Sequence, residues 1–111
     1  MAVRVRFAPS PTGSLHVGNA LTAVINRRFA DEHGGICVLR IDDTDPARVV
    51  EGGEDALLED LSWLAVAFDE GPYRQSDRGL LYEAAAARAL ESGAADRGDD
   101  GPYACVRAGR R

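Results

Sequence analysis

The sequence predicts an α/β fold. A strand, a helix and a second strand parallel to the first are followed by two further helices. Three observations support this: a short apolar run at residues 3–8, an amphipathic spacing over residues 15–32, and a nearly continuous apolar run at residues 36–41. A strand, a helix and a second strand in this order form a right-handed crossover, which makes the strands parallel. The 111 residues are enough for one hydrophobic core, so we expect a single domain.

A short strand and a rigid loop are expected first. Residues 3–8 alternate apolar side chains with Arg4 and Arg6, as in a strand with one solvated face. The next five residues, Pro-Ser-Pro-Thr-Gly at 9–13, contain two prolines and a glycine, which prevent the strand or a helix from continuing. This segment therefore connects the strand to the helix.

The first helix is expected over about residues 15–32. Its apolar residues recur at steps of three and four, which places them on one face directed at the core: Leu21, Val24, Ile25 and Phe29. Ser14 is the expected N-cap, and the glycines at 34–35 end the helix. The apolar run at 36–41 is typical of a strand buried on both faces of a parallel sheet.

Two more helices are expected after an acidic loop, Asp-Asp-Thr-Asp-Pro, in which Asp43 or Thr44 stiffens the turn. The first helix covers about residues 54–64, and its leucines and Trp63 are expected in the core. Residues 68–73 have the composition of a turn. Ser76 is the expected cap of the last helix, which runs to about Ser92.

The periodicity ends after Gly93. We therefore expect an ordered domain over residues 1–93 and an irregular or disordered tail over residues 94–111.

The composition excludes several functions. No apolar stretch is long enough for a membrane span or a signal peptide, so we expect a cytoplasmic protein without membrane contact. The net charge of −5 argues against binding to nucleic acid through bulk electrostatics. Cys37 and Cys105 cannot by themselves complete a four-ligand zinc site, so we predict no zinc. The acidic loop at 42–45 leaves a divalent-metal cluster possible on residue type alone. All 13 basic residues are arginine, so a mechanism that needs lysine cannot be completed by these residues.

The start of the first predicted helix is the segment most suited to chemistry. A helix N-terminus offers backbone N–H groups and a partial positive charge, for which phosphate is the natural ligand. Gly18 allows a ligand to approach the backbone, and His16 can donate a hydrogen bond to a phosphate oxygen where charge develops. The phosphate-binding patterns G-x-x-x-x-G-K-[ST] and G-x-G-x-x-G are both absent from the sequence.

This segment resembles the "HIGH" signature of class I aminoacyl-tRNA synthetases, here His-Val-Gly-Asn at 16–19, in the form found in glutamyl-tRNA synthetases, where RFAPSPTG precedes it. Three further blocks resemble that family in order: LRIDDTD at 39–45, Trp63-Leu64, and DEGPYRQSDR at 69–78. The resemblance implies that residues 1–93 are the N-terminal half of a Rossmann-like, HUP-type catalytic domain.

The family implies ATP-dependent formation of glutamyl-adenylate, with Mg²⁺ present, and transfer of the glutamyl group to the 3′ end of tRNA. Carried over by position, Arg6 pairs with a carboxylate of L-glutamate and Asp42 with its ammonium. The implied glutamate-binding set is Arg6, Ala8, Ser10 and Asp42, and the resemblance assigns the acidic loop to the substrate amine and to structural contacts, with no metal ligand. The implied ATP-binding set is Thr12, Gly13, His16, Gly18 and Asn19, of which His16, Gly18 and Asn19 are the catalytic residues.

The chain departs from the family at three points. Asp42 replaces the usual glutamate, which keeps the charge and shortens the side chain by one methylene, and Asn19 replaces the second histidine of the general motif. The second Rossmann half, with its lysine-bearing KMSKS-like loop, and the anticodon domain are absent from these residues. Two alternatives to the ligase stay open: a glutamyl-queuosine tRNA synthetase-like enzyme, and a non-catalytic remnant that binds ATP and glutamate. A separate chain that carries the complementing C-terminal half is a further partner to test.

Overall fold

The computed structural model describes residues 2–98 and 105–108 and divides the chain into two compact units, Met1–Asp77 and Arg78–Arg111. Every predicted site residue lies in the first unit. The predicted boundary at residue 93 stays a prediction about the extent of the domain.

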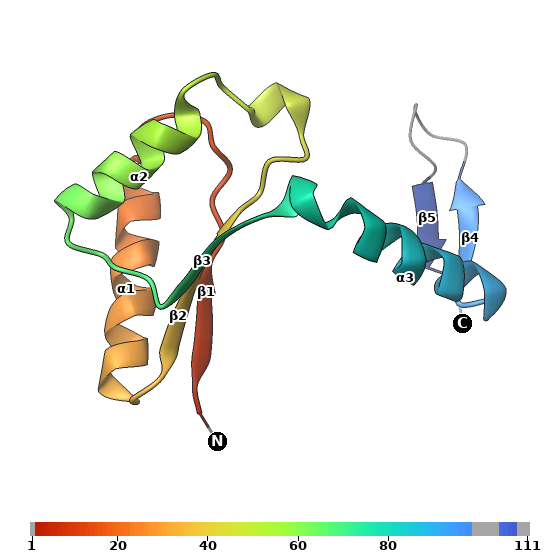
Figure 1. The fold of residues 1–111 in the computed structure, drawn as a ribbon, viewed down its shortest axis with the longest axis horizontal. Coiled ribbons are helices and arrows are strands. Elements are labelled where there is room, and N and C mark those ends of the chain that lie inside the picture. The colour runs from red at the N-terminus through yellow and green to blue at the C-terminus, as the bar shows by residue number, and fades with distance from the viewer. Residues whose placement is uncertain (1, 99–104, 109–111) are drawn as a thin grey trace. The chain divides into compact units, whose positions relative to one another are not determined.

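A three-stranded parallel sheet forms the centre of the first unit (Figure 1). Its strands are β1 (Arg4–Phe7), β2 (Ile36–Ile41) and β3 (Glu70–Arg74), with β2 in the middle. β1 and β2 pair in register, from Arg4 opposite Ile36 to Phe7 opposite Leu39. The predicted parallel β-α-β arrangement and the α/β class are therefore confirmed.

The third strand differs from the sequence prediction. The composition of residues 68–73 predicts a turn, and this is wrong, because β3 lies there beside β2. Gly71 and Pro72 are rare inside strands but are tolerated at the edge of a sheet, and the pairing shifts register at this point. Gly71 has a φ of 99°, and a Cβ atom there would collide with the carbonyl oxygen of Leu39, so the position requires glycine.

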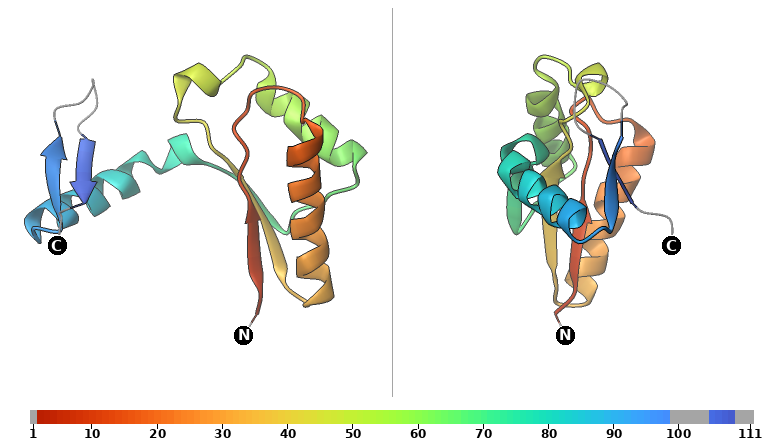
Figure 2. Two further views of the ribbon diagram at one scale, coloured as in Figure 1. Left: turned by 180° about the vertical axis from the view of Figure 1, so that it is seen from behind. Right: turned by 90° about the vertical axis from the view of Figure 1, so that its right-hand side faces the viewer.

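Two helices, α1 (Val17–Glu32) and α2 (Gly53–Trp63), lie on the same side of the sheet (Figures 1 and 2). A short 3₁₀ turn, η1 (Pro46–Arg48), lies between β2 and α2. The core forms where the sheet and the two helices meet, from these buried residues: Phe7, Leu39 and Ile41 of the sheet, Ala23 of α1, Leu57 and Leu61 of α2, and Val66.

α1 contacts the core through small side chains rather than large ones. Ala23 and Ala30 are fully buried, whereas Leu21, Ile25 and Phe29 are 59%, 55% and 45% exposed. The prediction that these three large residues face the core is wrong. Ala23 and Ala30 are seven residues apart, about two turns, so they share a neighbouring face of the helix, and their small size lets α1 approach the sheet closely. Val17, Leu21, Ile25 and Phe29, all exposed and four residues apart, are called the outer stripe of α1 below.

α2 follows the sequence prediction in part. Leu57 and Leu61 are buried, and Leu58 and Leu64 pack against the core from its margin. Trp63 is 84% exposed, so its predicted place in the core is wrong. No helix among the residues that the structure describes is long and apolar enough to span a bilayer.

The second unit holds α3 (Gly79–Glu91), reached from β3 through a 3₁₀ turn, η2 (Gln75–Arg78), and a hairpin of β4 (Ala95–Gly98) and β5 (Cys105–Ala108). The predicted last helix is therefore present, but Ser76 does not cap it, because the 3₁₀ turn intervenes and Arg78 stands at the cap position. The predicted irregular tail is wrong for the two strands, whose four-residue lengths are too short to give a periodic signal. The rest of that prediction, residues 99–104 and 109–111, lies outside the described residues.

Candidate functional site at the carboxyl edge of the sheet

The predicted site residues gather at one edge of the sheet. The loops that follow β1 and β2 leave the sheet at the same edge, and α1 begins there (Figure 1). Every one of the predicted residues is in β1, in these loops or in the first turn of α1 or beside it: Arg6, Ala8, Ser10, Thr12, Gly13, His16, Gly18, Asn19 and Asp42. The parallel strand order therefore brings together residues from two separate motifs.

Three contacts hold the loop between β1 and α1. The backbone N–H of Asp42 donates to the carbonyl of Pro9 at 2.9 Å, and that of Val50 donates to the carbonyl of Pro11 at 3.2 Å. The Asp60 carboxylate on α2 accepts a hydrogen bond from the backbone N–H of Leu15 at 2.8 Å. The loop is thereby fixed at its beginning, middle and end.

Two glycines, one in this loop and one in α2 against it, allow the loop to follow its path. Gly13 has a φ of 120°, a conformation that favours glycine. Gly53, buried at the start of α2, lies so close to the loop that a Cβ atom would collide with the carbonyl oxygen of Pro11. The sequence does not predict the roles of Gly53 and Asp60, because both act on residues some 40 positions earlier and carry no local motif.

Thr12, a predicted ATP-binding residue, is exposed in the loop, and its N–H donates to the carbonyl of Ser10 at 2.9 Å.

His16 is the N-cap of α1. Its Nδ1 accepts hydrogen bonds from the backbone N–H groups of Gly18 and Asn19, at 3.1 Å and 3.3 Å. The predicted cap at Ser14 is therefore wrong: Leu15 is held in the loop by Asp60, and the helix begins only at Val17. Because an accepting Nδ1 carries no proton, the neutral ring has its hydrogen on Nε2. His16 is exposed, so it presents an N–H donor to solvent at the edge of the sheet.

The ring also changes the expected roles of Gly18 and of the helix start. A Cβ atom at Gly18 would lie 3.1 Å from Cε1 and 3.2 Å from Nδ1 of His16, so glycine makes room for the imidazole. The N–H groups of Gly18 and Asn19 already bind this ring. The expectation that they stand unpaired for a phosphate is therefore wrong, and the donor that faces outward is His16 Nε2–H.

A second group of charges lies on the face of the sheet opposite the helices. Phe7, Leu39 and Ile41 point into the core, so alternate residues of the same strands point to the other face. Arg6 pairs in register with Val38 and shares that face. The Nε of Arg40, two residues further along β2, donates to Asp42 Oδ1 at 2.6 Å. Among the residues that the structure describes, the exposed Arg6 makes no side-chain hydrogen bond or ion pair.

The rest of the acidic loop is engaged in contacts within the protein. Asp43 accepts from the backbone N–H of Ser76 at 2.8 Å and from its hydroxyl at 2.6 Å, and the Thr44 hydroxyl donates to Gln75 at 3.0 Å. Burial alone would raise the pKa of Asp43, but the hydrogen bonds from Ser76 outweigh it and lower that pKa. These contacts agree with the expectation that Asp43 or Thr44 stiffens the turn.

The acidic residues do not form a metal-binding cluster. Asp42 pairs with Arg40, Asp43 with Ser76, and Asp45 caps η1 through the N–H of Ala47 at 3.0 Å. Within residues 2–98 and 105–108, no three His, Cys, Asp or Glu side chains are arranged to hold a metal ion.

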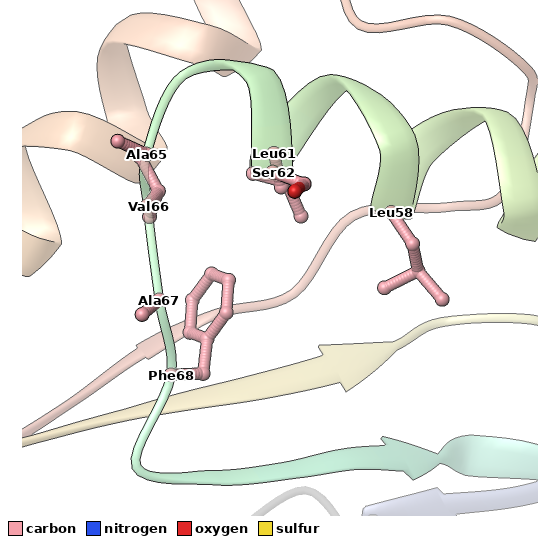
Figure 3. A pocket seen from close by; sticks show the side chains of 7 residues that line it. All are labelled: Leu58, Leu61, Ser62, Ala65, Val66, Ala67 and Phe68. Carbon is pink, nitrogen blue, oxygen red and sulfur yellow. The ribbon is translucent and has the colours of Figure 1, made fainter.

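Two other features are less suited to chemistry. Cys37 is fully buried on β2, and burial raises the pKa of its thiol, which disfavours the nucleophilic thiolate. An apolar hollow of about 290 Å³ lies between α2 and the segment after it. Figure 3 shows the side chains that line it, of which Ser62 alone carries a polar group. By contrast, a hollow of about 320 Å³ beside the start of α1 includes both His16 and Asp60 in its lining.

Comparisons with known proteins match both the sequence and the fold. The family described as "tRNA synthetases class I (E and Q), catalytic domain" matches residues 2–103, ten residues beyond the predicted end of the domain at 93. Glutamate–tRNA ligase 1 of Rubrobacter xylanophilus is 56% identical over 99 residues, which cover 89% of this chain and 23% of that protein. Glutamate–tRNA ligase of Christiangramia forsetii is 52% identical over 99 residues, covering 82% of this chain and 20% of that protein.

The fold has a solved counterpart. The crystal structure of a glutamate tRNA ligase from Elizabethkingia meningosepticum, in complex with its amino acid, superposes with a TM-score of 0.83 at 41% sequence identity. The superposition covers 92% of this chain and 22% of that one. The chain therefore spans between a fifth and a quarter of the length of these relatives.

Proposed function

Because the chain belongs to the family of class I tRNA synthetases for glutamate and glutamine, we propose that it takes part in ligating glutamate to tRNA. Its fold is the N-terminal part of the Rossmann-like catalytic domain of that family. The observation that carries the proposal is the arrangement of His16, Arg6 and Asp42 at one edge of the parallel sheet, with His16 Nε2–H available as a donor.

In the proposed reaction, a carboxylate oxygen of glutamate attacks the α-phosphorus of ATP. The bond from that phosphorus to the pyrophosphate oxygen breaks, which gives glutamyl-adenylate and pyrophosphate. The 3′-terminal adenosine of tRNA then attacks the acyl carbon, and AMP leaves. His16 Nε2–H donates to the phosphate as negative charge develops on its oxygens, which is where a fixed donor has the greatest effect.

The proposed glutamate site uses the residues on both sides of Pro9. Arg6 binds a carboxylate of the substrate, since its guanidinium fork matches a carboxylate and it has no protein partner among the described residues. Asp42 receives the ammonium. Ala8 and Ser10 flank Pro9, whose carbonyl is bound by the N–H of Asp42, so the backbone holds these small, half-buried residues near the start of the acidic loop.

The ATP site in this proposal comprises Thr12, Gly13, His16, Gly18 and Asn19. Mg²⁺ is expected with ATP, but the carboxylates of the acidic loop do not fit a metal site of their own, and no step is assigned to the ion. The absence of zinc, the cytoplasmic location and the contacts with tRNA stay predictions.

A second candidate function is binding without turnover. The chain spans 23% of its Rubrobacter relative, and half a crevice leaves the reacting atoms poorly aligned. Misplacement by about 1 Å already lowers a rate by about 100-fold. In that case the 111 residues bind ATP and glutamate as a non-catalytic remnant, and no exchange of pyrophosphate follows.

Glutamate-dependent exchange of pyrophosphate into ATP distinguishes the two candidates. We expect exchange by the 111-residue chain, alone or after addition of a separately expressed C-terminal half, and its loss in His16→Ala. Binding of ATP and glutamate without exchange under either condition favours the second candidate. Exchange that survives His16→Ala contradicts the role proposed for the histidine.

A further inference from the structure

We propose that Arg40 is a positioning residue that orients the Asp42 carboxylate toward the ammonium of glutamate. This inference rests on the proposed function, because it assigns a cause to the specificity of the same site. Arg40 belongs to neither the glutamate-binding set nor the ATP-binding set that the family resemblance implies.

Asp42 is held at two points. Its backbone N–H donates to the carbonyl of Pro9 at 2.9 Å, which fixes the main chain where β2 ends. Its Oδ1 accepts from Arg40 Nε at 2.6 Å, a short charge-assisted hydrogen bond. The side chains of Arg40 and Asp42 are 24% and 32% exposed, so the pair is partly shielded from water. The carboxylate is thus restricted in rotation, and Oδ1 is the oxygen that Arg40 engages.

This arrangement leaves a definite role for the other oxygen. An ammonium has three donors and needs a carboxylate oxygen whose direction is set before the substrate arrives. With Oδ1 on Arg40, Oδ2 is the oxygen for the substrate. Aspartate is one methylene shorter than the glutamate usual in the family, so its carboxylate stays close to the backbone and within reach of Arg40, two residues earlier on β2.

The charges also match the substrate. Arg6 and Arg40 share one face of the sheet, Asp42 binds Arg40 just after β2 ends, and the three side chains together carry one net positive charge. Glutamate has two carboxylates and one ammonium, hence one net negative charge. By binding Oδ1 of Asp42, Arg40 leaves Oδ2 for the ammonium of the substrate and leaves Arg6 for one of its carboxylates. A ligand that lacks the ammonium gains nothing from Asp42 and is indifferent to how Asp42 is oriented.

The test compares L-glutamate with glutarate, which has the same two carboxylates and no ammonium. Each is titrated by calorimetry into the 111-residue chain and its variants Arg40→Gln, Arg40→Lys and Asp42→Asn. We expect Arg40→Gln to weaken L-glutamate binding about tenfold relative to its effect on glutarate. Once Asp42→Asn is present, Arg40→Gln should have no further effect. Arg40→Lys, which keeps the charge, should restore part of the loss.

A matched control is Arg28→Gln, since Arg28 is an exposed arginine in the same unit whose carboxylate contact, to Glu32, is 3.9 Å long. It should change the affinity for neither ligand. Equal loss of both ligands in Arg40→Gln, or effects of Arg40→Gln and Asp42→Asn that simply add, would overturn the inference and indicate a general structural role.

The failure of this inference is distinguishable from that of the proposed function. Unmodified chain that binds neither ligand contradicts the glutamate site itself. The ¹⁵N signal of Arg40 Nε–H then reports on the pair directly: slow exchange with water that becomes fast in Asp42→Asn supports the orienting contact. Exchange that is equally fast in both proteins contradicts it.

Discussion

His16 supplies both the N-cap of α1 and the outward donor of the candidate site, and these tasks use different ring nitrogens. Nδ1 binds the backbone N–H groups of Gly18 and Asn19, which leaves the proton on Nε2. A side chain that caps a helix but carries no equivalent of Nε2–H would therefore separate the two roles.

We predict that His16→Ala lowers the free energy of unfolding by about 1 kcal/mol, because two N–H groups lose their acceptor. His16→Asn should recover most of this loss, since asparagine is a good N-cap residue. Both variants should bind ATP more weakly, because neither presents a donor at the position of Nε2. Urea denaturation measures the first effect and calorimetric titration with ATP the second. Full ATP affinity in His16→Asn would contradict the donor role.

Asp69 links the sheet to α1 and makes stability depend on pH. Its Oδ2 accepts from the backbone N–H of Cys37 at 2.8 Å and from Arg27 Nη1 at 2.9 Å. The hydrogen bond from Cys37, followed by that from Arg27, lowers the pKa of Asp69 below its usual value. A lowered pKa contributes stability above the pKa of the unfolded chain, and this contribution is lost as the pH falls through the folded value.

We therefore predict that stability falls on acidification below about pH 4, the usual carboxyl range, and that Asp69→Asn falls less steeply there. Urea denaturation at about pH 7 and about pH 3 measures the difference. A slope in Asp69→Asn equal to that of the unmodified chain would show that other carboxylates, such as Glu70 and Asp43, account for it.

At the scale of elements, the start of α2 fits against the loop that leads to His16. Gly53 packs directly on the carbonyl of Pro11, and Asp60, two turns later, binds the N–H of Leu15. α2 therefore supports the loop, although none of its residues belongs to the segment at 6–19 that resembles the family signature.

We predict that Gly53→Ala destabilises the protein by about 1–3 kcal/mol, because the new methyl group meets backbone rather than a movable side chain. Gly79→Ala is the matched control at the start of another helix, α3, where a Cβ atom would have open space. It should stabilise by about 0.5 kcal/mol. Thermal unfolding followed by circular dichroism measures both. Similar effects of the two substitutions would contradict the close contact with Pro11.

The elements also differ in how well the sequence predicts them. β2 is found at its predicted bounds because six consecutive residues, mostly apolar, are bounded by glycines and acidic residues. β3 is not predicted, because Gly71 and Pro72 mark a turn by composition and only pairing with β2 makes the segment a strand. The face of α1 is misassigned for a related reason, since which apolar stripe meets the sheet depends on how closely the helix can approach it.

The residues of the candidate site also differ in how well the sequence predicts them. Arg6, His16, Gly18 and Asp42 stand in local motifs and are predicted from the sequence. Asp60 is not predicted, because its partner is 45 residues away and a carboxylate on a helix is usually a solvated surface group. The hydrogen-bonding role of the His16 ring is missed as well, since the sequence does not indicate which ring nitrogen meets the helix.

For the whole molecule, the outer stripe of α1 is an exposed row of large apolar side chains on the first unit. Exposed apolar rows of this kind promote association. They contribute little to the stability of the isolated chain, because the core contacts of α1 are made by Ala23, Ala30 and the partly buried Val24.

We predict that the double substitution Leu21→Gln with Ile25→Gln raises the solubility of the chain and leaves its melting temperature almost unchanged. Ala23→Gln, on the same helix, should lower the free energy of unfolding by about 2 kcal/mol, because the longer side chain overfills a closed site. Light scattering against protein concentration measures association, and thermal unfolding measures stability. A large loss of melting temperature in the double variant would show that the stripe is part of the core.

Because the His16 ring lies so close to Gly18, the residue that position 18 tolerates depends on the residue at position 16. A side chain at position 18 would force the imidazole to shift by a few tenths of an ångström, away from the amides it caps. Selection for histidine at position 16 therefore also selects for glycine at position 18, even where no ligand touches that glycine. Descendants that cap the helix with serine or aspartate would lose this constraint, and only the proposed contact with ATP would then favour glycine at position 18.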